Sequence, residues 1–196
     1  MNRPEGKTFV VKSGYIRLLY VDSSDRLLTR MVMGKGAMFG DLPFRPHFFT
    51  SDERAISTSA ASIIEIGREV IEQHTKVDSE FQGIFLQTLA SQYSALDRRL
   101  QWQLITPIRS RVAAAVYDMV CFAGGRCGHG HLIDVRLTHE ELSELIAAAR
   151  PVVSEILLSF KSQGFLDYTR SHICVLNMDK LQAAILDGFE KRPSAK

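Results

Sequence analysis

The chain of 196 residues has no long apolar run and no excess of charge of one sign. No window approaches the roughly 20 apolar residues that a membrane-spanning helix needs, and the first seven residues lack the apolar stretch of a signal sequence. We therefore expect a cytoplasmic protein without membrane contacts. The net charge of +2, from 24 basic and 22 acidic residues, excludes a protein that coats nucleic acid non-specifically. Any contact with DNA must come from a local patch.

The sequence also lacks the residue patterns that metal binding and redox chemistry need. The three cysteines form no Cys-x-x-Cys pair, and an iron–sulfur cluster needs four thiolates, so we expect reduced packing residues and no metal site. They are Cys121, Cys127 and Cys174. The β region contains no His-x-His, which excludes a cupin-type metalloenzyme. Residues 124–131 combine four glycines with Cys127, His129 and His131. We interpret this stretch as a loop, with adventitious metal binding as the alternative.

Apolar and polar residues alternate through the first part of the chain, as is typical of half-buried strands. The runs with this pattern are 9–11, 15–21, 27–33 and 61–66. Turn-forming residues separate them, and we expect residues 22–26 to close a hairpin between the second and third runs. The sequence therefore predicts an antiparallel sandwich, roll or barrel.

A long helix is expected from about residue 78 to residue 104, where apolar residues repeat at spacings of three and four. These residues are Leu86, Leu89, Tyr93, Leu96 and Leu100. So narrow a stripe is typical of a coiled-coil seam and predicts a homodimer; the alternative is a helix that covers the β region. Pro107 then starts a second helix over residues 108–122, which places the domain boundary near residues 104–107.

Two short helices are expected after the glycine-rich stretch. Thr138 and Glu141 have the spacing of a capping box, which starts the first of them. Pro151 starts the second, and Gly164 ends it. Helices joined by only a few alanines predict a helix-turn-helix over residues 138–162.

A pair of short apolar runs follows the second helix. Residues 165–168 and 172–176 flank a polar turn, which predicts a β-hairpin. A hairpin in this place converts a helix-turn-helix into a winged helix.

Four motifs in this order resemble the bacterial transcription regulators of the CRP/FNR superfamily, typified by the cyclic-AMP receptor protein and the fumarate-nitrate reduction regulator. They are the strand and glycine turn at 9–18, the Gly-Ala-Met-Phe-Gly-Asp-Leu segment at 36–42, the long helix, and the Leu-Thr-x-x-Glu-Leu…Arg-x-x-Val-Ser helix-turn-helix. The resemblance covers nearly the whole chain. It implies an α+β fold: an N-terminal antiparallel β-roll like a cyclic-nucleotide-binding domain, a long dimerisation helix and a C-terminal winged helix-turn-helix.

The same resemblance implies how the chain is divided. The expected parts are a sensor-like roll over 1–76, a dimerisation helix over 77–105, a DNA-binding winged helix over 106–179, and a C-terminal helix and tail over 180–196. Family chains carry further residues ahead of the first strand seen here, so we expect a roll that is short at its N-terminus.

The positions that hold cyclic nucleotides in the family are altered here. Nucleotide-binding family members hold the phosphate with a Gly-Glu-Leu and an Arg-Ser-Ala segment and read the adenine with a Thr-Ser pair. Each of these three segments has a nearest match in this chain. These residues are Gly40, Asp41 and Leu42; Arg54 and Ala55; and Leu96 and Asp97. Aspartate in place of glutamate shortens the side chain that would reach a ribose hydroxyl. Alanine in place of serine removes a hydrogen-bond donor to the phosphate. A carboxylate at position 97 would repel a phosphate. The sequence therefore identifies no cofactor, and we expect that cyclic AMP is not the effector.

The resemblance also points to DNA-contacting residues. Arg150 stands where the family carries an arginine that donates to guanine, and the alternative for it is a phosphate contact. Pro151 replaces a glutamate that reads cytosine in the cyclic-AMP receptor protein, and Glu155 replaces a second base-reading arginine. Residues expected near bases or phosphates are Thr138, Ser154, Lys161, Arg170 and His172. Ala147 occupies a turn position where helix-turn-helix proteins favour glycine.

Together these features predict a homodimeric, sequence-specific transcription regulator, not an enzyme, controlled by a small effector other than cyclic AMP. Two alternatives stay open: a regulator that needs no effector, and a small-molecule or cyclic-nucleotide receptor that does not bind DNA. The expected partners are a pseudo-palindromic double-stranded DNA operator, a second copy of the chain and, for an activator, RNA polymerase.

Overall fold

The structure is a computed structural model that describes residues 6–21, 27–44, 52–58, 60–133, 135–169 and 172–190. The chain forms two compact units, Met1–Asp97 and Arg98–Lys196. No helix in the described ranges is long and apolar enough to cross a membrane.

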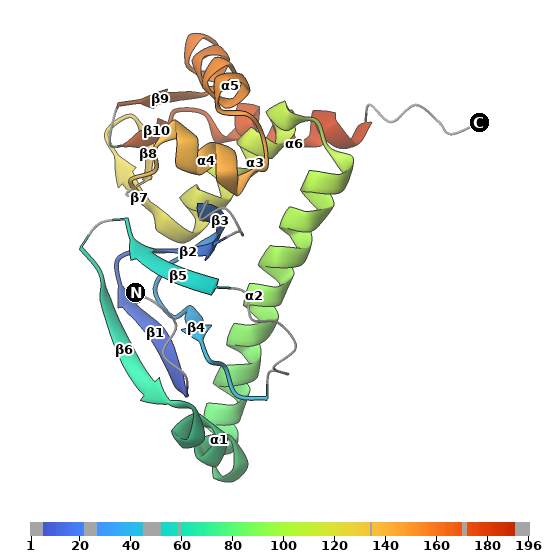
Figure 1. Cartoon of the computed structure of the whole chain (residues 1–196). Coiled ribbons are helices and arrows are strands. Elements are labelled where there is room, and N and C mark those ends of the chain that lie inside the picture. The colour runs from blue at the N-terminus through green and yellow to red at the C-terminus, as the bar shows by residue number, and fades with distance from the viewer. Residues whose placement is uncertain are drawn as a thin grey trace. The chain divides into compact units, whose positions relative to one another are not determined.

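The first unit contains two antiparallel sheets (Figure 1). One sheet has the order β4-β1-β6 and the other β3-β2-β5. The strands are β1 (Lys7–Ser13), β2 (Ile16–Val21), β3 (Leu27–Met33), β4 (Met38–Gly40), β5 (Asp52–Ser57) and β6 (Ser62–Gly67). The pairing of β2 with β3 confirms the predicted hairpin, whose turn at 22–26 lies outside the described residues.

Inward-facing apolar side chains from both sheets form one core. The phenyl rings of Phe9 on β1 and Phe39 on β4 stack with centroids 5.2 Å apart. Val11, Ile16, Leu18 and Met33 complete the buried cluster. Gly40 has a φ of 91°, and a Cβ atom there would lie 2.7 Å from the carbonyl oxygen of Lys7, so glycine is required for β4 to approach β1. Burial of this cluster between two sheets identifies a β-roll.

Two helices follow the roll: α1 (Arg68–Val77) and α2 (Ser79–Ile105). Asp78 separates them, because its carboxylate accepts hydrogen bonds from the backbone N–H groups of Glu80 and Phe81, both at 3.0 Å, and so caps α2. The Gln92 amide pairs with both backbone groups of Met38 at 2.9 Å. These two bonds fix α2 against β4 of the roll.

The second unit contains a helix-turn-helix and a small sheet. Its elements are α3 (Ile108–Ala123), β7 (Gly124–Cys127), β8 (Gly130–Ile133), α4 (His139–Leu145), α5 (Arg150–Ser162), β9 (Leu166–Tyr168), β10 (Ile173–Val175) and α6 (Met178–Glu190). The sheet order is β7-β8-β10-β9, and the antiparallel pairing of β9 with β10 confirms the predicted wing.

The glycine-rich stretch is a strand pair, and its interpretation as a loop was wrong. β7 pairs with β8, and β8 pairs in turn with β10 of the wing. Glycine disfavours strands locally, but hydrogen bonding to the distant β10 stabilises β8 as a strand. A Cβ atom on Gly130 would lie 2.1 Å from the carbonyl oxygen of Val175, which explains a glycine at this position. No cluster of metal-binding side chains occurs among the described residues.

The C-terminal helix α6 packs along α3. The Ser110 hydroxyl donates a buried hydrogen bond to the carbonyl oxygen of Ala184 at 2.8 Å. A Cβ atom on Gly188 would lie 2.5 Å from the oxygen of that hydroxyl, so the two helices approach closely there. The predicted C-terminal helix therefore belongs to the same compact unit as the winged helix, and the predicted tail at 191–196 lies outside the described residues.

Candidate nucleic-acid interface

The first helix of the motif, α4, begins at a complete capping box. The Thr138 hydroxyl accepts from the backbone N–H of Glu141 at 3.2 Å, and the Glu141 carboxylate accepts from the backbone N–H of Thr138 at 2.7 Å. Leu142 and Leu145 are buried beneath the helix. Two otherwise unpaired N–H groups are satisfied, so this part of the sequence prediction is confirmed.

The turn between α4 and α5 has a strained backbone and is stabilised by hydrogen bonds from Arg111. Ala147 has a φ of 52°, in the left-handed region that favours glycine, as the sequence predicted. The Arg111 guanidinium on α3 donates to the carbonyl oxygens of Ile146 at 3.3 Å and Ala147 at 3.5 Å. Sequence reasoning missed Arg111, because its partners are backbone atoms some 35 residues away.

Helix α5 presents its first turns to solvent (Figure 1). Its inward face is buried and consists of Val153, Leu157 and Phe160. Its outward face is exposed and consists of Arg150, Pro151, Val152, Glu155 and Leu158. Ala149, the N-cap, supplies no side-chain acceptor, so no side chain of the cap residue covers the positive end of the helix dipole.

Arg150 is paired on the surface. Its Nε lies 3.7 Å from the Glu140 carboxylate on α4, and the two side chains are 65% and 58% exposed. An ion pair this exposed contributes little to stability. The guanidinium can therefore leave Glu140 for another acceptor at small cost.

His139 connects the two helices of the motif to the wing. Its Nδ1 lies 3.0 Å from the Ser154 hydroxyl oxygen on α5, and its ring meets the Tyr168 ring edge-on with centroids 5.2 Å apart. Burial, together with the nearby positive charge of Arg150, lowers the pKa of His139 below its ordinary value. The Ser154 hydroxyl predicted to contact DNA is thus positioned by a histidine that stays neutral at neutral pH.

Lys161 lies at the other end of α5, beside the wing. It forms an ion pair with the Asp167 carboxylate at 2.6 Å and lies 5.2 Å from the centre of the Tyr168 ring. The hydrogen bond to Asp167 raises the pKa of Lys161, and it lowers the pKa of Asp167. His172 is half-buried next to the wing turn, and Arg170 lies outside the described residues.

The nucleotide-binding candidates in the roll do not form one site. A cavity of about 40 Å³ lies inside the roll, and Gly40, Leu42 and Leu96 contribute to its lining. It also contains an ion pair of 2.6 Å between Arg30 and Glu53, whose side chain is 3% exposed. Pockets for small ligands measure about 300 Å³ or more. This cavity has room for a water molecule and no room for a nucleotide.

The other candidates lie away from that cavity. Asp41 accepts from the backbone N–H of Gly6 at 3.1 Å and from the Arg68 guanidinium at 3.4 Å, so its carboxylate ties β1 to α1. Ala55 packs on the roll core, and Arg54 lies on the opposite face of β5 because successive residues of a strand alternate. Asp97 is not among the residues that line the cavity.

Comparisons with known proteins agree with this geometry. Residues 110–184 match the Crp-like helix-turn-helix domain. The chain is similar to the CRP-like cAMP-activated global transcriptional regulator of Mycobacterium tuberculosis (strain CDC 1551 / Oshkosh), with 24% identity over 181 residues, 91% of this chain and 79% of that protein.

Solved structures share the fold at low sequence identity. TTHB099, a CRP-family transcriptional regulator from Thermus thermophilus, has a TM-score of 0.76 at 18% identity over 97% of this chain and 94% of that one. FixK2 from Bradyrhizobium japonicum has a TM-score of 0.77 at 17% identity over 93% and 89%. The chain therefore contains a Crp-like helix-turn-helix domain over residues 110–184, and it is similar in sequence and fold to CRP-family transcription regulators.

Proposed function

We propose that the protein is a cytoplasmic homodimer that reads a pseudo-palindromic operator with the N-terminal turns of α5. The observation that carries this proposal is the division of α5 into a buried apolar face and an exposed face that begins with Arg150. A helix held from beneath and exposed at its N-terminus fits a major groove.

Each exposed residue has a chemical role in this proposal. The planar fork of Arg150 suits the O6 and N7 acceptors of guanine. Pro151 offers an apolar surface to a thymine methyl group, and the Glu155 carboxylate can accept from the N4 amino group of cytosine. Residues that contact or approach the phosphates are Thr138, Ser154, Lys161, Arg170 and His172.

The dimer would form along α2. Leu86, Tyr93 and Leu100 are 56%, 71% and 52% exposed and recur every seventh residue, which places them on one stripe of the helix. Leu104 extends the stripe and is 74% exposed. Leu89 and Leu96, the other two predicted seam residues, are half-buried on the side of α2 that faces the roll. Leu89 packs against the buried cluster of Met38, Ile71 and Phe85, and Leu96 lines the cavity inside the roll.

An effector would have to be something other than cyclic AMP, because the cavity inside the roll measures about 40 Å³ and the Arg30 and Glu53 side chains that line it are paired with each other. The small cavity also favours the alternative of a regulator that needs no effector. RNA polymerase is a further partner if the protein activates transcription.

Arg150 provides the test. After operators are selected from a random DNA pool, base-by-base affinities are measured for the wild type, Arg150→Ala and Arg150→Lys. Loss of a bidentate guanine contact costs about 1–3 kcal/mol at one base pair of each half-site. Lysine keeps the charge and loses the fork, so it should restore general affinity without restoring that base preference.

Two outcomes would contradict this assignment. Equal weakening on every sequence in Arg150→Ala would make Arg150 a phosphate contact. Full recovery of base preference in Arg150→Lys would show that charge, and not the planar fork, is what the DNA recognises.

A further inference from the structure

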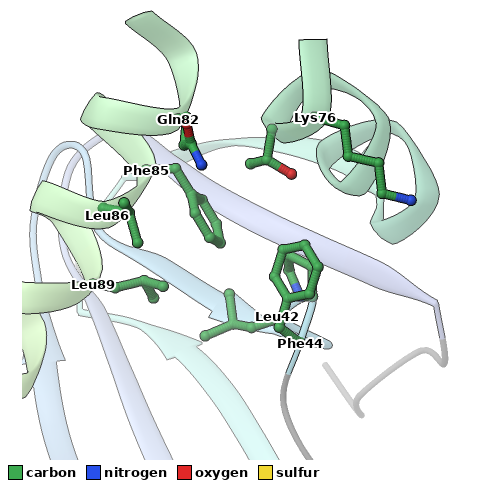
Figure 2. Close-up of a pocket in the computed structure, with 9 residues that line it drawn as sticks. Leu42, Phe44, Lys76, Gln82, Phe85, Leu86 and Leu89 are labelled. Carbon is green, nitrogen blue, oxygen red and sulfur yellow. The ribbon is translucent and has the colours of Figure 1, made fainter. Parts of the chain in front are cut away.

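The first unit carries a second and much larger pocket outside the roll. It lies between α1, α2 and the segment that follows β4, and it has a volume of about 760 Å³ (Figure 2). Small-molecule sites generally measure about 300 to 1,000 Å³. This pocket therefore has the size of a ligand site, which the cavity inside the roll does not have.

The walls of the pocket divide by polarity. Leu42, Phe85, Leu86 and Leu89 provide an apolar floor and side (Figure 2). The polar groups lie along the edge nearest α1, where Figure 2 shows Gln82 and Lys76. A site of this kind fits a ligand with a hydrocarbon body and one polar head.

Lys76 gives that edge its charge. Neighbouring polar groups are engaged elsewhere: the Thr75 hydroxyl donates to the carbonyl oxygens of Ile71 and Glu72 at 2.9 and 3.0 Å, and the Glu72 carboxylate accepts from Arg68 at 2.8 Å. The Asp78 carboxylate caps α2. Lys76 is exposed and makes no ion pair with any described residue. Figure 2 shows the Lys76 ammonium turned away from Gln82, at the end of a flexible, exposed side chain. A change of rotamer would let it donate, together with the Gln82 amide N–H group, to an anionic head.

Phe44 adds a strained wall. It has a φ of 61°, which is rare for a bulky side chain, and it is 63% exposed beside the pocket. A left-handed backbone is unfavourable for phenylalanine, and an exposed ring recovers little of that cost by burial in the free chain. Strain of this kind is found at ligand clamps, where a bound molecule can cover the ring.

We propose that this pocket binds a monocarboxylate with an extended hydrocarbon chain, its carboxylate at Lys76 and Gln82 and its chain against Phe44, Phe85 and Leu89. Leu86 belongs both to the pocket wall and to the exposed stripe of α2. Binding would therefore act on the helix that carries the dimer seam, a consequence that rests on the proposed function.

Calorimetry with decanoate on the full chain tests the site. We expect saturable binding of one decanoate per chain and much weaker binding of decan-1-ol, which lacks the charge. Lys76→Gln should weaken decanoate binding about tenfold, the cost of a charge-assisted hydrogen bond. Phe44→Ala should weaken decanoate and decan-1-ol alike. Lys35→Gln, an exposed lysine in the turn before β4, is the matched control and should change nothing.

The result that would overturn the proposal is an absence of saturable decanoate binding, or equal binding by Lys76→Gln and the wild type. Failure to bind because a second copy already covers the pocket would overturn it too, and sedimentation at the same concentration identifies that case. Adding decanoate to the operator assay separates the two claims. Calorimetric binding without any change in DNA affinity refutes only the coupling to α2, whereas loss of operator recognition in the wild type refutes the proposed function.

Discussion

Ala147 is the only non-glycine residue with a positive φ among the described residues of the second unit. Its φ of 52° is expensive for alanine and free for glycine, while the backbone N–H still donates to the carbonyl oxygen of Glu144 at 3.1 Å. We expect Ala147→Gly to raise the free energy of unfolding by about 1 kcal/mol. Urea titration followed by circular dichroism measures this change.

The neighbouring alanine supplies the control for that substitution. Ala148 does not have a positive φ, so Ala148→Gly should only increase the conformational freedom of the unfolded chain and lower stability by roughly 0.5–1 kcal/mol. If both substitutions destabilise to the same degree, the turn does not store strain at residue 147.

His139 makes the stability of the motif depend on pH. Its pKa in the folded protein is lowered, mainly by burial, so the unfolded chain binds more protons between that value and the ordinary pKa of about 6.5. The contribution of neutral His139 is complete above about pH 6.5 and is lost as the pH falls through the folded-state pKa. Acid should therefore weaken the helix-turn-helix.

Scanning calorimetry should show this dependence as a falling Tm between about pH 7.5 and pH 5.5. The fall should be smaller in His139→Gln, whose side chain does not titrate. His129→Gln is the matched control for the loss of an imidazole, because His129 is exposed in the turn between β7 and β8. An unchanged slope in His139→Gln would refute the role of this residue.

At the residue scale, sequence reasoning succeeded where the signal was local. The capping box depends on Thr138 and Glu141, three positions apart, so it could be predicted. The left-handed Ala147 was anticipated from its place in the turn of the helix-turn-helix motif, where glycine is favoured. The contacts of Arg111 with the turn and of His139 with Ser154 depend on packing between helices. No spacing rule gives such contacts before the fold is known.

At the scale of elements, α2 has two apolar stripes where the sequence indicated one. The stripe through Leu86, Tyr93 and Leu100 is exposed, and the stripe through Leu89 and Leu96 lies on the roll side. Residues three or four apart on a helix are neighbours, so a heptad pattern alone does not separate the two stripes. Only the burial of each side chain does.

The exposed stripe predicts where the dimer can be broken without harm to the roll. Tyr93→Lys combined with Leu100→Lys should yield folded monomers, because both side chains are exposed in the single chain. Operator affinity should fall strongly, since the two half-sites would then be bound separately. Analytical ultracentrifugation measures the mass.

Ile84→Lys is the matched control for the dimer. Ile84 is 58% exposed on the same helix, but it lies about 160° around the axis from Leu86 at 100° per residue. The Ile84→Lys variant should therefore remain dimeric. Monomers in Ile84→Lys, or dimers in the double variant, would show that another surface joins the copies.

The strands were predicted less completely than the helices. The short β4 and the polar β5 have no clear alternation, and β7 and β8 contain glycines that local propensity assigns to a loop. For β4, β5 and β8 the pairing includes a strand far along the chain, whereas β7 pairs with the adjacent β8. The helices of the helix-turn-helix carry local signals, a capping box in α4 and a proline in the first turn of α5, which explains why their positions were predicted more accurately.

For the whole molecule, the proposed twofold dimer would present two recognition helices to successive major grooves, with half-sites about one helical turn apart. Cyclic AMP should leave the operator affinity of this dimer unchanged, because the cavity inside the roll measures about 40 Å³. Fluorescence anisotropy with labelled operator, with and without cyclic AMP, checks this expectation. An increase in affinity that is lost in Glu53→Ala would show that the roll opens for the nucleotide.

The close approach at Gly130 has a consequence for the genetics of this regulator. Any side chain at position 130 would meet the Val175 carbonyl, so single-nucleotide changes in that codon that alter the amino acid would separate β8 from β10. A screen for alleles that have lost repression or activation would then recover codon 130 together with codon 150. Suppressors of the two classes would differ: a second mutation that stabilises the fold could rescue the first, while only an altered operator could rescue the second.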